Sequence, residues 1–232
     1  GRNAFKIKKP LKLSFLNFST LERRKHFCER EFKLNSRFSD IYQGVVPIRA
    51  QGGKWYVGSG HGKVMEYAVQ MKRLLTSRRM DNMLRADKVA LDEIEKLARV
   101  IAAFHISAEK VSLPFDHLQA RKTFNDISGI RNFVEKQLGP PFVKIISQSI
   151  QWSNRFLTAH AKRIQQRIDL GFKRDVHGDL HSANIFLYRN PELFDCIEFN
   201  ERYRQIDVLY EVAFLCMDLE RFSKKSLSNA LL

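Results

Sequence analysis

Two hydrophobic patterns follow one another along the chain. Over the first third, short runs alternate apolar and polar residues, at 4–8, 44–49, 54–57 and 65–72. A period of two residues is typical of β-strands. Beyond Leu74, apolar residues return every three or four positions, which is typical of helices. The pattern predicts an α+β protein in which antiparallel strands precede a larger set of helices.

Turn and cap residues punctuate the first third. Pro10 ends the first strand, and Gly52-Gly53 predicts a hairpin turn between the second and third. Ser19 and Glu22 have the spacing of a capping box, with Ser19 as the N-cap. We therefore expect a helix from Ser19 to about residue 37.

The remainder predicts mainly helices, at 88–108, 124–138, 142–168 and 206–222, with a break at 139–141. Short strands are expected near 173–176, 185–188 and 193–196. The change of period places a join near residues 72–78. We predict a small β lobe over residues 1–74 and a helical lobe over 75–232.

Composition limits the class of protein. The chain has 232 residues, 44% hydrophobic and 28% charged, as in globular proteins. No run of 18 apolar residues occurs, so no membrane span is expected. Its three cysteines are widely spaced and include no Cys-x-x-Cys, which disfavours a disulfide framework or zinc site and fits the cytoplasm.

The net charge of +15 favours anionic partners such as nucleotides, nucleic acid or membrane lipids. We favour a solvated basic surface around an anion-binding cleft. Nucleic acid is disfavoured because the sequence has no RNA-reading aromatic motif and no helix-turn-helix signature. The 25 acidic residues against 40 basic ones also argue weakly against a cationic aminoglycoside as the native substrate.

The most informative segment is His-Gly-Asp-Leu-His-Ser-Ala-Asn-Ile at residues 177–185, followed by Leu-Phe-Asp at 193–195. Asn184 lies five residues after Asp179, and Asp195 lies eleven further. Phosphoryl transfer from ATP needs a carboxylate at the attacking hydroxyl and oxygen ligands for Mg²⁺. Protein kinases place Asp, Asn and a second Asp in the same order. Singly, each of these residues would be an ordinary turn cap.

This run resembles the catalytic loop of aminoglycoside phosphotransferases and their relatives, which include choline and fructosamine kinases and adopt a protein-kinase-like fold. The runs at 15–22, 44–48 and 194–200 are similar to those of an uncharacterised bacterial branch of that superfamily. Members of the branch are sometimes fused to a P-loop kinase domain, and such a domain is a possible fused or separate partner. The chain itself has no Gly-x-x-x-x-Gly-Lys-Ser/Thr run.

The resemblance implies a bilobal, kinase-like fold and ATP-dependent transfer of the γ-phosphate to a hydroxyl group of a small molecule. Asp179 would be the catalytic base, and Asn184 and Asp195 would bind Mg²⁺. Such kinases hold the α- and β-phosphates with a strand lysine that pairs with a helix glutamate. We favour Lys6 with Glu31, and keep Lys8 and Glu29 as alternatives. Adenine is expected near residues 70–74, at backbone groups.

Several neighbouring residues have more than one interpretation. His177 is expected beneath the loop, bonded to its backbone, and a zinc site with His181 is disfavoured because no third soft ligand lies near. His181 could position phosphate or substrate, or be structural. Glu198 could join the metal shell or hold Arg202 or Arg204. Asp207 could brace the catalytic loop or cap the next helix.

Two departures from the superfamily pattern matter. No glycine follows Asp195, so switching of an activation loop is not inferred. The hairpin that usually covers the phosphates would precede Lys6 and is missing from this sequence, and the chain ends soon after Asp207, before the helices that shape substrate pockets in this superfamily. We therefore expect truncation at one or both ends. The alternatives to a kinase are a non-catalytic kinase-like module with a regulatory or interaction role and, less favoured, a basic nucleic-acid-binding protein.

Overall fold

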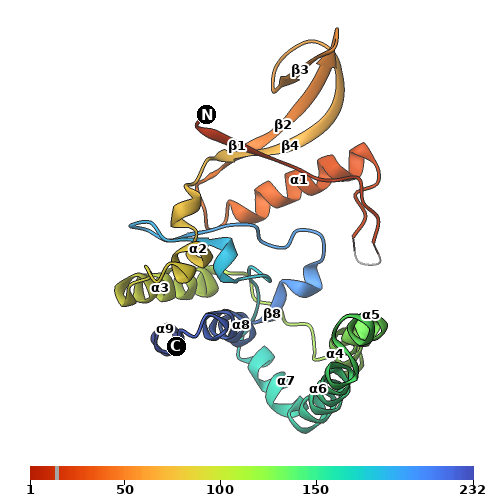
Figure 1. Cartoon of the computed structure of the whole chain (residues 1–232), viewed down its shortest axis with the longest axis vertical. Helices are drawn as coiled ribbons and strands as arrows, with labels where there is room; N and C mark the ends of the chain where they lie inside the picture. The colour runs from red at the N-terminus through yellow and green to blue at the C-terminus, as the bar shows by residue number, and fades with distance from the viewer. Residues whose placement is uncertain (14–15) are drawn as a thin grey trace. The chain divides into compact units, whose positions relative to one another are not determined.

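The structure is a computed structural model that describes residues 1–13 and 16–232. Ser14 and Phe15 lie outside the described residues, and with them the start of the 15–22 run. The chain groups into two compact units (Figure 1). Unit 1 combines Gly1–Glu109 with Arg174–Leu232, and unit 2 is Lys110–Lys173. The division at residues 74 and 75 into two lobes stays a prediction.

An antiparallel sheet opens unit 1. Its strands are β1 (Asn3–Ile7), β2 (Tyr42–Gln51), β3 (Lys54–Val57) and β4 (Lys63–Lys72), in the order β1-β4-β2-β3. All four strands predicted in this part of the chain are confirmed. Gly52 and Gly53 have φ of 54° and 73°, which glycine adopts without strain and which suit a two-residue hairpin turn. These glycines form the tight turn between β2 and β3.

Helix α1 (Leu21–Asn35) packs against β2 and β4 (Figure 1). The expected cap is wrong by one residue, because the Thr20 hydroxyl accepts the hydrogen bond from Arg23 N at 3.3 Å. Ser19 instead turns its hydroxyl to the Asn17 side chain. The buried Cys28 joins α1 to an apolar cluster of the sheet that comprises Ile41, Tyr42, Val69 and Met71.

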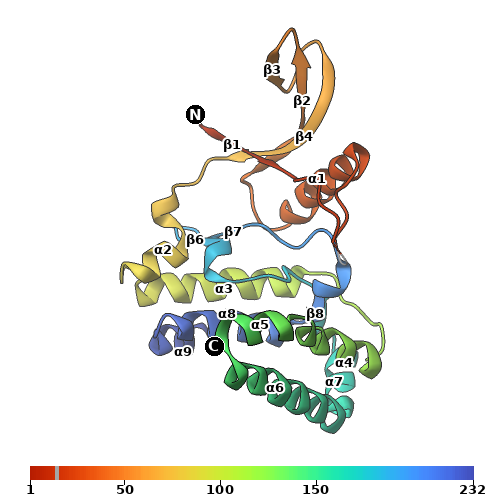
Figure 2. The same cartoon turned by 45° about the vertical axis from the view of Figure 1, so that its right-hand side comes forward.

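Besides α1, the α-helices of unit 1 in the described residues are α2 (Met80–Arg85), α3 (Leu91–Ser107), α8 (Val208–Arg221) and α9 (Lys225–Leu231). Helix α9 packs against both α3 and α8 (Figure 2). Their shared core includes the fully buried Ile94, Leu97, Leu180, Leu215 and Leu219. Leu180 belongs to the predicted catalytic loop, so this core anchors the loop from below.

Four short strands frame that loop. β5 (Lys173–Asp175) pairs with β8 (Gln205–Asp207), and β6 (Ile185–Phe186) pairs with β7 (Glu192–Leu193). The strands expected near 173–176, 185–188 and 193–196 are thus present, and shorter than predicted. β8 takes the first two residues of the helix expected from residue 206.

Unit 2 consists of α4 (His117–Asn125), α5 (Arg131–Leu138), α6 (Pro140–Ala159) and α7 (Ala161–Asp169), with α6 packed against α4 and α5. The expected break is confirmed: Gly139, at φ 91°, ends α5, and Pro140 begins α6. The long helix predicted over 142–168 is wrong, because the chain breaks at His160. The helix expected over 124–138 is interrupted by a 3₁₀ turn at Asp126–Ile130.

The two ends of unit 2 lie side by side. Val111 N donates to Lys173 O at 2.9 Å, and Asp175 N donates to Glu109 O at 2.9 Å. The chain therefore leaves unit 1 after Glu109 and returns to it at Arg174 through one pair of adjacent backbone segments, which we call the neck.

Among the helices formed by residues 1–13 and 16–232, none has both the length and the apolar character needed to cross a bilayer. All three cysteines are free and buried.

Candidate functional site

Lys6, the favoured phosphate-binding lysine, contacts two carboxylates in the folded chain. Its Nζ lies 2.9 Å from Glu31 Oε1 and also bonds Asp195 Oδ1. Burial alone would lower the pKa of Lys6, but the carboxylates of Glu31 and Asp195 outweigh burial and raise it. The Lys6 ammonium therefore stays charged between two carboxylates that come from distant parts of the chain.

Glu31 pairs with both candidate lysines. Its Oε2 accepts a hydrogen bond from Lys8 Nζ at 2.7 Å, and Lys8 in turn bonds Glu198 Oε1. Lys6 on β1 and Lys8 directly after it thus both reach Glu31, which fits the prediction that they lie on one face. Glu29 instead lies exposed beside Lys25, at 3.7 Å. The geometry favours Glu31 over Glu29 as the partner of a strand lysine.

The two lysines differ in exposure. The side chain of Lys6 is 37% exposed, whereas that of Lys8 is 3% exposed. Burial alone would lower the pKa of Lys8, and the charges of Glu31 and Glu198 reverse this and raise it. Burial raises the pKa of Glu198, with Lys8 opposing. Of the two, only Lys6 is placed to meet a ligand in solvent.

The predicted catalytic loop brings Asp179 and Asn184 together. Asn184 Nδ2 donates to Asp179 O at 3.0 Å and lies 3.3 Å from Asp179 Oδ2. His181 Nε2 lies 3.5 Å from the same Asp179 oxygen. The hydrogen bond from His181 holds the pKa of Asp179 below its usual value, and the same contact raises the pKa of His181. Asp179, whose side chain is 44% exposed, is an ionised carboxylate open to solvent.

Strand pairing places Asp195 beside Asn184. Ile185 faces Leu193 in the β6–β7 pair, and Phe194 N donates to Asn184 O at 3.1 Å. Asp195 follows directly, in the left-handed region at φ 67°, and its N–H donates to the hydroxyl of Tyr42 at 2.9 Å. A chain of contacts therefore runs from Glu31 through Lys6 to Asp195, and from the preceding residue, Phe194, through its backbone to Asn184 and Asp179. All five predicted site residues belong to it.

The loop rests on buried groups below it. His177 is fully buried; its Nε2–H donates to Phe194 O at 2.9 Å and its Nδ1 accepts from Asp179 N at 3.3 Å. Because both ring nitrogens are engaged, His177 is not available to a metal, and burial lowers its pKa. Gly178 has φ 85°, and an added Cβ would lie 2.7 Å from Tyr203 O, so no other residue fits there.

Two carboxylates on α8 hold the loop, and sequence analysis missed both. Glu211 Oε1 accepts from Gly178 N at 2.7 Å, and Asp218 Oδ2 accepts from Ser182 N at 2.8 Å. Asp207 accepts from Leu209 N at 2.8 Å as the N-cap of α8, which confirms that alternative. The signal in the sequence was the presence of two acidic residues, seven apart, that interrupt a largely apolar run from Val208 to Leu219.

Glu198 also has a partner that the sequence did not suggest. Of its two expected roles, a place in the metal shell stays untested, while the contact with Arg202 or Arg204 is replaced: Glu198 bonds Lys8, and Arg204 pairs with Asp175 at 2.7 Å. The Arg204 and Arg37 guanidiniums offset the effect of burial and hold the pKa of Asp175 below its usual value. Arg204 Nη1 also donates to Ile197 O at 2.8 Å, which steadies the segment after Asp195.

Two surface cavities lie away from these residues. One of about 430 Å³ includes Lys72 and Leu74 from the expected adenine region, but its other lining residues are Asp40, Ile41, Tyr188, Arg189, Asn190 and Glu192. It contains none of the five site residues, and the placement of adenine near residues 70–74 stays a prediction.

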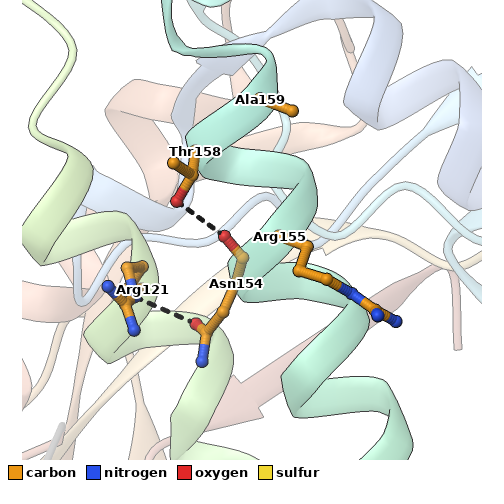
Figure 3. Close-up of a pocket in the computed structure, with 5 residues that line it drawn as sticks. All are labelled: Arg121, Asn154, Arg155, Thr158 and Ala159. Atoms are coloured by element: carbon orange, nitrogen blue, oxygen red, sulfur yellow. Dashed lines mark hydrogen bonds between the residues drawn. The ribbon is translucent and has the colours of Figure 1, made fainter.

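The other cavity, of about 390 Å³, belongs to unit 2 and lies between α4 and α6 (Figure 3). Arg121 Nε donates to Asn154 Oδ1 at 3.2 Å, while Arg155 points away from that pair (Figure 3). The two guanidiniums do not converge on one point, and no carboxylate lines the cavity. It therefore lacks the groups that phosphoryl transfer needs.

Comparison with curated proteins finds relatives in mycobacteria. An uncharacterized protein of Mycobacterium bovis and two uncharacterized proteins from strains of Mycobacterium tuberculosis are each 30% identical over 235 residues. The match covers 99% of this chain and 45% of each relative. The chain thus spans less than half the length of the relatives. Neither a known protein family nor a solved structure matches it.

Proposed function

We propose that the chain is part of an ATP- and Mg²⁺-dependent kinase that transfers the γ-phosphate to a hydroxyl group of a small molecule. The observation that carries this is the position of Lys6, which bonds Glu31 on a helix and Asp195 on a distant segment at once. Kinases use a lysine and glutamate pair to hold nucleotide phosphates, next to an Asp that binds the metal. Asp179 and Asn184 supply the remaining groups of that set.

Each residue has a distinct role in this proposal. Lys6, charged and partly exposed, contacts the α- and β-phosphates, and Glu31 orients it. Asp179 orients the acceptor hydroxyl and takes its proton, because it is an exposed, ionised carboxylate. The kinase-like bilobal fold, with lobes over residues 1–74 and 75–232, belongs to the same proposal. The sheet, helix and loop of unit 1 support it.

The residues present fit a magnesium ion. The amide nitrogen of Asn184 is tied to Asp179, which leaves its Oδ1 as an acceptor. The partly exposed carboxylate of Asp195 follows Phe194, whose N–H donates to Asn184 O. Oxygen donors of this kind, few in number, are what Mg²⁺ accepts from proteins. The ion would neutralise negative charge on the phosphates.

The surroundings of the reaction also belong to the proposal. The acceptor is a small hydroxyl compound, the compartment is the cytoplasm, and a P-loop kinase domain is a candidate partner, fused or separate. The greater length of the mycobacterial relatives leaves room for further segments in the whole protein.

Nucleotide binding and turnover test the proposal. We expect Asp179→Asn to abolish detectable phosphoryl transfer, because loss of a general base lowers the rate by a factor of roughly 10²–10⁴. The affinity for Mg-ATP should persist. Asp195→Asn should weaken Mg-ATP binding itself, because Asp195 is a proposed metal ligand. Isothermal titration calorimetry with and without Mg²⁺, and ATP turnover, would be measured on this chain and on a version extended at both ends.

Two results separate the alternatives. Equal ATP turnover by wild type and Asp179→Asn would contradict the catalytic assignment and favour a non-catalytic kinase-like module. Steeply salt-dependent binding to arbitrary DNA, with no affinity for Mg-ATP, would favour a nucleic-acid-binding protein instead.

A further inference from the structure

The ion pairs around Glu31 continue beyond the residues that phosphate binding requires. Glu31 Oε1 contacts Lys6 and Glu31 Oε2 contacts Lys8, while Lys6 continues to Asp195 and Lys8 to Glu198. The result is a line of five alternating charges: Asp195, Lys6, Glu31, Lys8 and Glu198. For Glu31 to orient a phosphate-binding lysine, its contact with Lys6 would be enough. The second lysine, Lys8, and the carboxylate that Lys8 bonds, Glu198, therefore need an explanation.

The inner half of this line is shut off from solvent. The side chains of Glu31, Lys8 and Glu198 are 0%, 3% and 6% exposed. Ions taken out of water gain little net stability over well-packed apolar side chains, so stability alone does not explain them. We attribute a positioning role to these ions instead, because charged hydrogen bonds fix the positions of the groups that they join.

Lys6 has a task that Lys8 does not share. In the structure Lys6 divides its ammonium between Glu31 and Asp195. When a nucleotide binds under the proposed function, Lys6 turns toward the phosphates and Asp195 toward the metal, so the contact between them is given up. Glu31 then needs an anchor that does not move. Lys8 holds the other oxygen of Glu31, at 2.7 Å, and is itself fixed by Glu198.

We propose that Lys8 and Glu198 are positioning residues that form a second clamp: they keep Glu31, and through it Lys6, in place while Lys6 exchanges Asp195 for nucleotide phosphate. This inference rests on the proposed kinase function. The clamp joins three segments: Lys8 follows β1, Glu31 belongs to α1, and Glu198 lies three residues after Asp195. It therefore couples the phosphate side of the site to the metal side by a route that bypasses Lys6.

The test compares single and double variants of the full chain. Lys8→Met removes the ammonium and keeps an unbranched side chain, and Glu198→Gln keeps the shape and removes the charge. Lys8→Arg restores a cation. Arg24→Met is the matched control, because Arg24 is also buried, lies on α1 and pairs with Glu66 at 2.6 Å, but it is not part of the line of charges.

Two readouts are needed. The first is the dissociation constant of Mg-ATP, with protection of Lys6 from amine acylation, read by mass spectrometry, as a site-specific check. We expect Lys8→Met and Glu198→Gln each to weaken binding about 10- to 100-fold, by analogy with the loss of an outer-shell partner at metal sites. Their double variant should lose less than the product of the two, and Lys8→Arg should recover part of the loss.

The second readout is amide hydrogen exchange without nucleotide. Lys8→Met should speed exchange in α1 and also at residues 195–198, whereas Arg24→Met should speed exchange in α1 and near its partner Glu66 but leave residues 195–198 unchanged. Glu198→Gln should speed exchange at residue 31, 167 positions away in the sequence. This reciprocal effect is expected whether or not a nucleotide is added, so it tests the clamp separately from catalysis.

The outcomes separate two kinds of failure. If wild type binds Mg-ATP and protects Lys6, but the two variants do so equally well, the clamp has no positioning role and the inference is overturned while the proposed function stands. Faster exchange with unchanged affinity also overturns the inference, because the clamp is then structural only. If wild type neither binds Mg-ATP nor protects Lys6, the proposed function fails and the inference fails with it.

Discussion

Asp195 has a backbone conformation that L-residues seldom adopt, at φ 67°. Asp tolerates this region better than most residues, because its short side chain forms local hydrogen bonds. Here the neighbours fix it from two sides: the Tyr42 hydroxyl accepts its N–H, and Lys6 holds its carboxylate. The conformation directs the backbone N–H toward the sheet and the side chain toward β1. One residue thereby joins the predicted metal side of the site to the predicted phosphate side.

The lowered pKa of the buried His177 allows a prediction of how the stability of the protein depends on pH. Its native pKa lies below the ordinary value of 6.5 because it is buried, so below pH 6.5 the unfolded chain takes up a proton that the native chain refuses. The free energy of unfolding should therefore fall as pH drops from 6.5, by up to about 1.4 kcal/mol per pH unit. Urea unfolding at pH 7.5 and 5.5 measures it.

His177→Gln supplies the comparison. An amide nitrogen can still donate to Phe194 O but does not titrate. The variant should therefore be less stable than wild type at pH 7.5, and its free energy of unfolding should fall less between pH 7.5 and pH 5.5. His61→Gln, at an exposed turn, is the control and should keep the wild-type drop. An equal drop in wild type and His177→Gln would contradict the assignment.

Site residues differ in how far the sequence could identify them. Asp179, Asn184 and Asp195 form a motif with fixed spacing, and the structure brings them together through the β6–β7 pairing. Tyr42 had no such signal, because its role is to accept a backbone N–H from a residue 153 positions away. Contacts of that kind depend on tertiary placement and leave no local pattern.

Helix α8 supports the catalytic loop through two acidic residues. Glu211 and Asp218 are seven positions apart, which is about two helical turns, so they lie on one face of the helix. Glu211 joins Gly178 N to His105, and Asp218 joins Ser182 N to Arg221. The loop backbone is thus held at both ends by one rigid element.

Removing one support should loosen one end of the loop. Asp218→Ala leaves the N–H of the buried Ser182 without its acceptor, which costs about 1–3 kcal/mol of stability. We expect faster amide exchange at residues 180–184 and a smaller change at residue 178, which Glu211 still holds. Glu220→Ala, two positions along α8, is the matched control and should leave exchange in the loop unchanged. Uniform loosening of the whole molecule would count against a local role for Asp218.

At the scale of elements, the sequence predicted types better than boundaries. The strands of the sheet follow clear alternation and were found, including β3 at its observed bounds. The break at His160 was missed because the apolar spacing continues from α6 into α7, and only the backbone, at φ −108° and ψ 11°, marks it. The α1 cap was misplaced by one residue because Ser19 and Thr20 are both suitable caps.

At the scale of the molecule, periodicity alone could not give the two compact units. It marks a change near Leu74, yet residues 1–109 group with 174–232. What unites them includes contacts such as Lys6 with Asp195, 189 positions apart. Residues this far apart in the sequence meet only in the folded state, so no short window of sequence contains both members of such a contact.

Because the two ends of unit 2 meet at the neck, we predict that unit 2 can be removed without unfolding unit 1. Glu109 O and Asp175 N are 2.9 Å apart, so a short Gly/Ser linker in place of Lys110–Lys173 closes a small gap at little entropic cost. We expect the shortened chain to unfold cooperatively and to keep slow amide exchange in α1 and α8. An aggregated product, or one without slowly exchanging amides, would show that unit 1 needs unit 2 to fold.

The same neck has a consequence for how such a protein can diversify. A segment that leaves and re-enters at adjacent residues can be lengthened, shortened or exchanged by recombination at two nearby points. The strand register and the line of charges from Asp195 to Glu198 are untouched by such events. We therefore expect the length and sequence of helices α4 to α7 to differ more between related proteins than the rest of the chain does.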